Sequence, residues 1–228
     1  MSLYPRLLLY LKKDKIDKKS ALLYYLNNRF INSKTGVTMR EEILKAAAER
    51  FARYGFRKTT LEDIARDINK VKSSVYYYFA GKEEIFRGVI ENELEKFAVM
   101  LMSDVGKAGT ADKKLHAFII SHLRIFEKFA KGFSTIKDMY FSELDIMQKA
   151  RSKYDEREIN AIEALLEEGR KNDLFEFADI KNTAGIILTA IKGAEQEFLV
   201  RKCRKNMKAV SETMASLLVN GVLKEKIK

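Results

Sequence analysis

Apolar residues recur every three or four positions along most of the chain, which is the spacing of amphipathic helices. Strand-like alternation of apolar and polar residues is absent, and Pro5 is the single proline, so nothing from Met39 onward forbids long helices. The pattern predicts an all-α fold, with helices at about 39–54, 60–68, 72–79, 82–105, 111–130, 133–150, 152–172, 179–202 and 205–224.

The stretch from Thr59 to Lys82 has the pattern of a helix-turn-helix. Thr60 can cap the first helix, with Asp63 in the reciprocal capping position three residues later. Asn69 suits a tight left-handed turn between the helices, because it tolerates positive φ better than other non-glycine residues. One apolar stripe of the first helix is formed by Leu61, Ile64, Ala65 and Ile68.

The second helix, 72–79, has a surface suited to DNA. A helix N-terminus favours anions, Ser and Tyr hydroxyls can donate to phosphate, and a Lys near the start can reach guanine in the major groove. Val75 and Phe79 share the face that packs on the first helix. We expect Tyr76 and Tyr77 to lie outside and Tyr78 to be partly in the core.

The positive net charge of the chain favours a polyanionic binding partner. The net charge is +11, and residues 1–38 hold eight Lys or Arg against two Asp, while 39–88 hold eleven against eight acids. Most of the basic excess therefore accompanies the helix-turn-helix, which suits DNA.

The run Val75–Tyr76–Tyr77–Tyr78–Phe79, followed by Lys82 and Glu83, resembles the signature of the TetR family of bacterial transcriptional regulators. The turn departs from that signature, with Asn69 in place of Gly and Lys70–Val71 in place of Val-Ser. The resemblance, together with the surface chemistry, implies contacts with the DNA backbone from Thr59, Thr60, Tyr76, Tyr78 and Lys82, and base selection by Lys72, Ser73, Ser74 and Tyr77.

The same resemblance divides the chain into a DNA-binding domain of three helices, 39–82, and a larger helical domain for effector binding and dimerisation, 83–228. Residues 1–38 form a basic extension with three open interpretations: an extra docking helix, a basic arm that touches phosphates, or an artefact of an early start codon. In the last case Met39 is the natural start.

The helices of the second domain are rich in Phe, Met and Tyr, and by resemblance they enclose a pocket for a small, apolar effector. His116 and His122 are six residues apart and point to different sides of a helix, so they cannot share a metal as an i, i+4 pair does. No cofactor or metal is expected. The predicted pocket residues are Phe97, Met100, Phe118, His122, Phe126, Met139, Tyr140 and Tyr154.

The last two helices carry stripes of small and aliphatic residues. Such stripes are either core within one chain or an exposed patch that a second copy covers. By resemblance we expect a homodimer with a four-helix bundle, in which the interface residues are Ala184, Ile187, Leu188, Ile191, Ala194, Met214, Leu217, Leu218 and Val222.

The sequence contains no motif typical of catalysis, since it lacks a phosphate loop, a nucleophile elbow and a cluster of metal ligands. Cys203 is the single cysteine and no apolar stretch approaches a membrane span, so we expect a cytoplasmic protein. By resemblance, the favoured function is a ligand-responsive repressor that binds a palindromic operator as a homodimer and is released by a small, apolar effector. The alternatives are a regulator controlled by a protein partner or by no effector, and a small-molecule binding protein or enzyme with a vestigial DNA domain. Operator, effector, regulated genes and the choice between repression and activation stay open.

Overall fold

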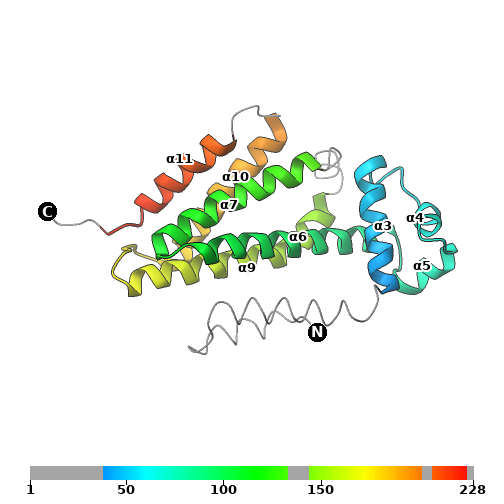
Figure 1. The fold of residues 1–228 in the computed structure, drawn as a ribbon, viewed down its shortest axis with the longest axis horizontal. Helices are drawn as coiled ribbons and strands as arrows, with labels where there is room; N and C mark the ends of the chain where they lie inside the picture. The colour runs from blue at the N-terminus through cyan, green and yellow to red at the C-terminus, as the bar shows by residue number, and fades with distance from the viewer. Residues whose placement is uncertain (1–37, 133–143, 202–206, 225–228) are drawn as a thin grey trace. The chain divides into compact units, whose positions relative to one another are not determined.

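The computed structural model describes residues 38–132, 144–201 and 207–224, so the predicted pocket residues Met139 and Tyr140, most of the 1–38 extension and Cys203 lie outside the described residues. The all-α prediction is confirmed, and strands are absent from the described ranges. In chain order the helices are α3 (Met39–Tyr54), α4 (Leu61–Asp67), α5 (Lys72–Tyr78), α6 (Lys82–Lys107), α7 (Ala111–Gly132), α9 (Leu144–Lys171), α10 (Ile180–Arg201) and α11 (Met207–Asn220) (Figure 1).

One predicted boundary is wrong. The apolar pattern predicts a helix end near residue 150, whereas α9 runs without a break from Leu144 to Lys171. Residues 150–152 are Ala, Arg and Ser, none of which interrupts a helix as Pro or Gly does, so the change of apolar pattern there marks a change of neighbours and not a turn.

By contact the chain separates into Met1–Glu42 and Ile43–Lys228. In the first unit, Thr38 and Glu41 form the predicted capping box: the Thr38 amide donates to Glu41 Oε2 at 2.9 Å, and the Glu41 amide donates to Thr38 Oγ1 at 3.3 Å. At the other end of α3, Gly55 adopts a φ of 81°, a conformation that glycine takes without strain.

In the second unit, the helix-turn-helix is joined to the start of α6 by three aromatic rings. The centroid of Phe86 lies 5.6 Å from that of Phe51 and 4.9 Å from that of Phe56. All three side chains are buried, so α6 begins inside the core of the DNA-binding region.

The C-terminal bundle is built around α7, which packs against α6, α9, α10 and α11. Figure 1 shows α7 lying beside α6, with α10 and α11 on its other side. Leu115, Ile119 and Leu123 are fully buried at helical spacing on α7, which accounts for the predicted amphipathic pattern of this segment. Because α6 contributes Phe97, Leu101 and Val105 to the same core, it belongs to both halves of the second unit.

The segment after α9 is held by the segment that follows α11. The Glu176 amide donates to Val222 O and the Lys224 amide donates to Leu174 O, both at 2.9 Å. Phe175, which pairs with Leu223 in an isolated β-bridge, inserts its buried ring against Gly169 of α9. The last described residues therefore pin the connection between α9 and α10.

We expect Gly169→Ala to lower the free energy of unfolding by about 1–3 kcal/mol through overpacking. A β-carbon at this position would lie 1.9 Å from the Phe175 ring, which has no free space into which to move because it is buried. Chemical denaturation measures the loss. Gly106→Ala is the matched control, because a β-carbon there meets nothing within 4 Å and should not destabilise the helix.

Candidate DNA-binding surface and ligand pocket

The local geometry of the helix-turn-helix agrees with the sequence analysis. The Asp63 amide donates to Thr60 Oγ1 and the Thr60 amide donates to Asp63 Oδ2, both at 3.1 Å, so the capping box is complete. Asn69 has a φ of 53°, which is the left-handed conformation expected of the turn. Arg50 adds an anchor that the pattern did not indicate, since its guanidinium contacts both oxygens of Asp67, at 2.5 Å and 2.7 Å.

Helix α5 presents a polar and aromatic face. Val75 and Phe79 are buried beneath it, whereas Tyr76, Tyr77 and Tyr78 are 50%, 83% and 40% exposed. Lys72 and Ser73 are exposed and Ser74 is partly exposed on the same short helix. Six of the residues expected to touch DNA therefore lie together on one accessible element: Lys72, Ser73, Ser74, Tyr76, Tyr77 and Tyr78.

Lys72 has an intramolecular partner in this state. Its ammonium forms an ion pair with Glu62 of α4 and lies 5.6 Å from the centroid of the Tyr76 ring. The hydrogen bond to Glu62 raises the pKa of Lys72, and the same contact lowers the pKa of Glu62. Lys72 can therefore contact a base or a phosphate only if it gives up this carboxylate.

Two predicted phosphate contacts need correction. Thr59 is 1% exposed and its hydroxyl donates to Gly55 O at 2.9 Å, so it does not face solvent. The Lys82 ammonium donates to Phe56 O and Thr59 O, both at 2.9 Å, and lies 4.5 Å from the centroid of the Phe56 ring. Both side chains hold the turn between α3 and α4. Thr60 is exposed, although its hydroxyl also donates to Asp63 Oδ2 at 2.8 Å.

Lys82→Met tests whether Lys82 holds the turn between α3 and α4 or contacts DNA. We expect a loss of about 1–2 kcal/mol in the free energy of unfolding, because two carbonyl groups lose a charged donor. The salt dependence of DNA binding should stay unchanged. Lys72→Met is the contrast: it should leave stability nearly unaltered and reduce the salt slope by about one if Lys72 meets a phosphate. If Lys82→Met instead left stability unaltered and reduced the salt slope, Lys82 would be a DNA contact. Denaturation and fluorescence anisotropy at several salt concentrations measure both quantities.

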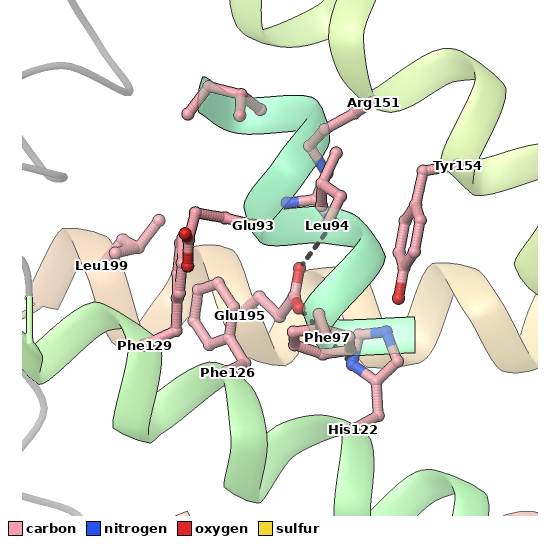
Figure 2. Close-up of a pocket in the computed structure, with 11 residues that line it drawn as sticks. Glu93, Leu94, Phe97, His122, Phe126, Phe129, Arg151, Tyr154, Glu195 and Leu199 are labelled. Carbon is pink, nitrogen blue, oxygen red and sulfur yellow. Dashed lines mark hydrogen bonds and ion pairs between the residues drawn. The ribbon is translucent and has the colours of Figure 1, made fainter. Parts of the chain in front are cut away.

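A small pocket lies between α6, α7, α9 and α10, with a cavity volume of about 40 Å³ (Figure 2). One part of its wall is apolar and the other carries ionisable groups. The apolar part consists of Ile90, Leu94, Phe97, Phe126, Phe129 and Leu199, and the polar part consists of Glu93, His122, Arg151, Tyr154 and Glu195.

The polar part is a buried network that joins three helices. His122 of α7 is 1% exposed; its Nε2 contacts Glu158 of α9 and its Nδ1 lies 3.4 Å from Glu195 of α10. Arg151 Nη2 donates to Glu195 Oε2 at 3.1 Å. Burial lowers the pKa of His122, but the Glu158 and Glu195 carboxylates outweigh burial and raise it above its ordinary value. The ring is therefore an imidazolium that links two acids.

This shift predicts a stability that depends on pH. The folded pKa of His122 is raised above the unfolded value of 6.5, so its contribution is fully present below pH 6.5 and is lost as pH rises through the folded pKa. We expect the melting temperature to fall as pH rises above about 6.5, and this slope to be much smaller in His122→Asn. An equal slope in both proteins would contradict the charged state. His116→Asn, at a partly exposed position, is the control and should keep the wild-type slope.

The structure brings together four of the predicted pocket residues, Phe97, His122, Phe126 and Tyr154. Two others are corrected: Phe118 is fully buried behind His122, and Met100 is 45% exposed on α6 and does not line the pocket. Arg151 and Glu195 were missed, although the sequence holds a signal for them. Arg151, Tyr154, Glu158 and Ile162 follow one another at helical spacing, and Glu195 follows Ile191 by four, so these charges interrupt apolar stripes.

The predicted dimer stripes mostly belong to the core of one chain. Ala184, Ile187, Leu188, Ile191 and Val222 are buried, and Ala194, Met214 and Leu218 are partly buried against that core. Leu217 is the exception, at 68% exposed. The opposite face of α10 carries the exposed residues Ile186 and Val200, at 63% and 47%. Within the single chain the stripe of α10 is therefore core, and the exposed apolar side chains lie on the opposite face.

Residues 43–89, which cover the helix-turn-helix and the start of α6, match the family described as bacterial regulatory proteins, tetR family. These residues therefore form a DNA-binding domain of the TetR family. It is 22% identical over 183 residues to the fatty acid metabolism regulator protein of Bacillus subtilis (strain 168), covering 79% of this chain and 94% of the relative. It is also 38% identical over 64 residues to the biofilm operon icaADBC negative transcriptional regulator IcaR of Staphylococcus epidermidis, covering 28% and 35%.

A solved structure of the regulator FadR from Bacillus subtilis in complex with stearoyl-CoA has the same fold, with a TM-score of 0.60 at 21% identity, covering 79% of this chain and 97% of that chain. The matched domain and the relatives, which are transcriptional regulators, indicate a DNA-binding regulator and not an enzyme. Within the described residues, none of the helices combines the length and the apolar character that a membrane span requires.

Proposed function

We propose that this TetR-family protein is a repressor that binds a palindromic operator as a homodimer and releases it when a small, apolar effector enters the pocket. The supporting observation is the continuity of α6. This single helix begins at Lys82 within the turn-holding contacts of the DNA-binding region, and its residues Ile90, Leu94 and Phe97 line the pocket. A ligand that shifts α6 can thereby change the position of the helix-turn-helix.

On the DNA side, base selection falls to Lys72, Ser73, Ser74 and Tyr77, and the backbone contacts fall to Thr60, Tyr76 and Tyr78. The exposure of these side chains supports the assignment. Thr59 and Lys82 act indirectly, because they fix the turn that leads into the capped start of α4.

The homodimer is proposed on the exposed side of α10 and α11. Ile186 and Val200 of α10 and Leu217 of α11 are large apolar side chains that are exposed among the described residues. Small residues lie between them on α10, at Thr189 and Gly193, and would let a second pair of helices approach closely. A two-fold dimer also suits a palindrome, whose half-sites lie about 34 Å apart along the DNA.

The effector class is suggested by relatives. One is named a fatty acid metabolism regulator, and one solved relative contains stearoyl-CoA. The apolar wall of Phe126, Phe129 and Leu199 suits an alkyl chain. A long-chain acyl-CoA is therefore the first effector to test.

Selection of the purified protein on randomised duplex DNA, followed by sequencing, tests this function. We expect a palindromic consensus, binding that weakens steeply with salt, and dissociation when stearoyl-CoA is added. Failure to enrich a sequence would contradict the regulator role of the site. An asymmetric consensus bound by one protomer would contradict the homodimer, and specific binding that ignores acyl-CoA would contradict this effector class.

A further inference from the structure

We infer that the pocket contains a carbonyl-binding subsite, in which the Tyr154 hydroxyl donates a hydrogen bond to the carbonyl oxygen of an uncharged acyl group. This inference rests on the proposed function and specifies the chemistry of its effector. Such a subsite would not favour a free carboxylate or a plain hydrocarbon.

Tyr154 is a buried donor without a conventional acceptor. It is 5% exposed, lines the pocket from α9, and packs edge-on against Phe97 with a centroid distance of 6.0 Å. Its hydroxyl lies near the Glu158 carboxylate, yet it completes no hydrogen bond of normal geometry within the described residues. Figure 2 shows the hydroxyl directed toward the His122 ring, among the polar residues that line the pocket. A buried hydroxyl in this state gains free energy when a ligand supplies an acceptor.

The hydroxyl keeps its proton. Burial raises the pKa of Tyr154, and the nearby Glu158 carboxylate raises it further, so the phenol stays neutral over the whole physiological range. A neutral phenol in this position can donate to a ligand oxygen.

A second donor lies beside the first. His122 Nδ1 is buried and makes no hydrogen bond, although Glu195 Oε1 lies 3.4 Å away. His122 is charged and its Nε2 is held by Glu158, so Nδ1 carries a proton as well. That proton is directed at Glu195, so the Tyr154 hydroxyl is the donor left for a ligand, whereas Glu158, the nearby acid with an unpartnered oxygen, does not line the pocket. The arrangement suits a ligand group that only accepts.

The surrounding charges favour an uncharged group. Each carboxylate around the polar wall has its own cation: Glu93 pairs with Lys96 at 2.5 Å, Asp155 with Lys192, Glu158 with His122 and Glu195 with Arg151 at 3.1 Å. An added carboxylate would be an unpaired buried charge among four acids, which is costly. A thioester or ester carbonyl brings an acceptor without that charge.

The test compares three probes on the full-length protein by isothermal titration calorimetry: stearoyl-CoA, its thioether analogue S-octadecyl-CoA, and stearate. The two CoA compounds differ in the carbonyl oxygen alone. The wild-type protein should bind the thioester about five- to tenfold more tightly than the thioether, the size expected of one neutral hydrogen bond. Stearate should bind more weakly than the thioester.

Tyr154→Phe should bind both CoA compounds equally, because the donor is gone while the ring and its packing remain. Phe129→Ala is the matched control: it should weaken both compounds and preserve their ratio, since it removes only apolar wall. Melting curves of both variants verify folding before the titrations.

Each contrary result has a distinct meaning. Equal binding of thioester and thioether by the wild type overturns the carbonyl subsite and leaves the acyl-responsive regulator intact. Stearate binding as tight as the thioester overturns the preference for an uncharged group. If neither CoA compound binds while the operator is still recognised, the subsite and the acyl effector are both wrong, and the DNA-binding function stands.

Discussion

Arg151→Met is expected to lower the free energy of unfolding by about 3–5 kcal/mol, the cost of leaving one member of a buried ion pair uncompensated. Glu195 is 4% exposed and has Arg151 as its hydrogen-bonded cation, while its distance to His122 Nδ1 is longer. Methionine fills a similar volume, so the loss reports charge and not a cavity. Chemical denaturation at neutral pH provides the measurement.

A double variant separates charge from packing. Arg151→Met combined with Glu195→Gln should recover most of the lost stability, because the neutral amide no longer needs a cation. Arg124→Met is the surface control: Arg124 is exposed and pairs with Asp104, so its loss should cost less than about 1 kcal/mol. If the double variant is as unstable as the single one, the network stabilises the fold through packing and not through charge.

Phe86→Ala is expected to destabilise the chain by about 3–5 kcal/mol, as large-to-small changes of a buried aromatic do. Phe86 is 0% exposed and packs on both Phe51 and Phe56 where α6 enters the DNA-binding region. The cavity would lie at the joint that links the pocket helix to the helix-turn-helix. Operator affinity should therefore fall together with stability, as measured by denaturation and anisotropy.

Phe86→Leu keeps most of the volume and should cost less than half as much. If Phe86→Ala retained full operator affinity at a temperature where it is folded, the aromatic joint would not position the recognition helix.

Local features of the fold could be predicted from the sequence because their partners lie within four residues. The capping box of Thr60 and Asp63 and the positive φ of Asn69 are of this kind. Lys82 could not be assigned this way. Its partners Phe56 O and Thr59 O lie more than twenty residues earlier in the chain, and side-chain patterns do not show where backbone carbonyl groups end up.

The candidate sites show the same limit. A stripe such as Ala184, Ile187 and Ile191 predicts that one helix face is buried, but the pattern is identical whether α7 and α9 or a second copy covers it. Arg151 and Glu195 neutralise each other inside the bundle, whereas single charges in a sequence are expected in water. Pairing across helices is a tertiary property, so their place in the pocket was not predicted.

The unbroken course of α6 makes it a lever arm. From Phe97 at the pocket to Lys82 at the turn the helix spans roughly 22 Å, at about 1.5 Å rise per residue. A tilt of about 5° around Phe97 would carry the Lys82 end by roughly 2 Å, which is enough to break hydrogen bonds at DNA phosphates. Two such arms in a dimer would add their displacements across the operator, so a ligand that moves few atoms in the pocket could still change half-site spacing by several ångströms.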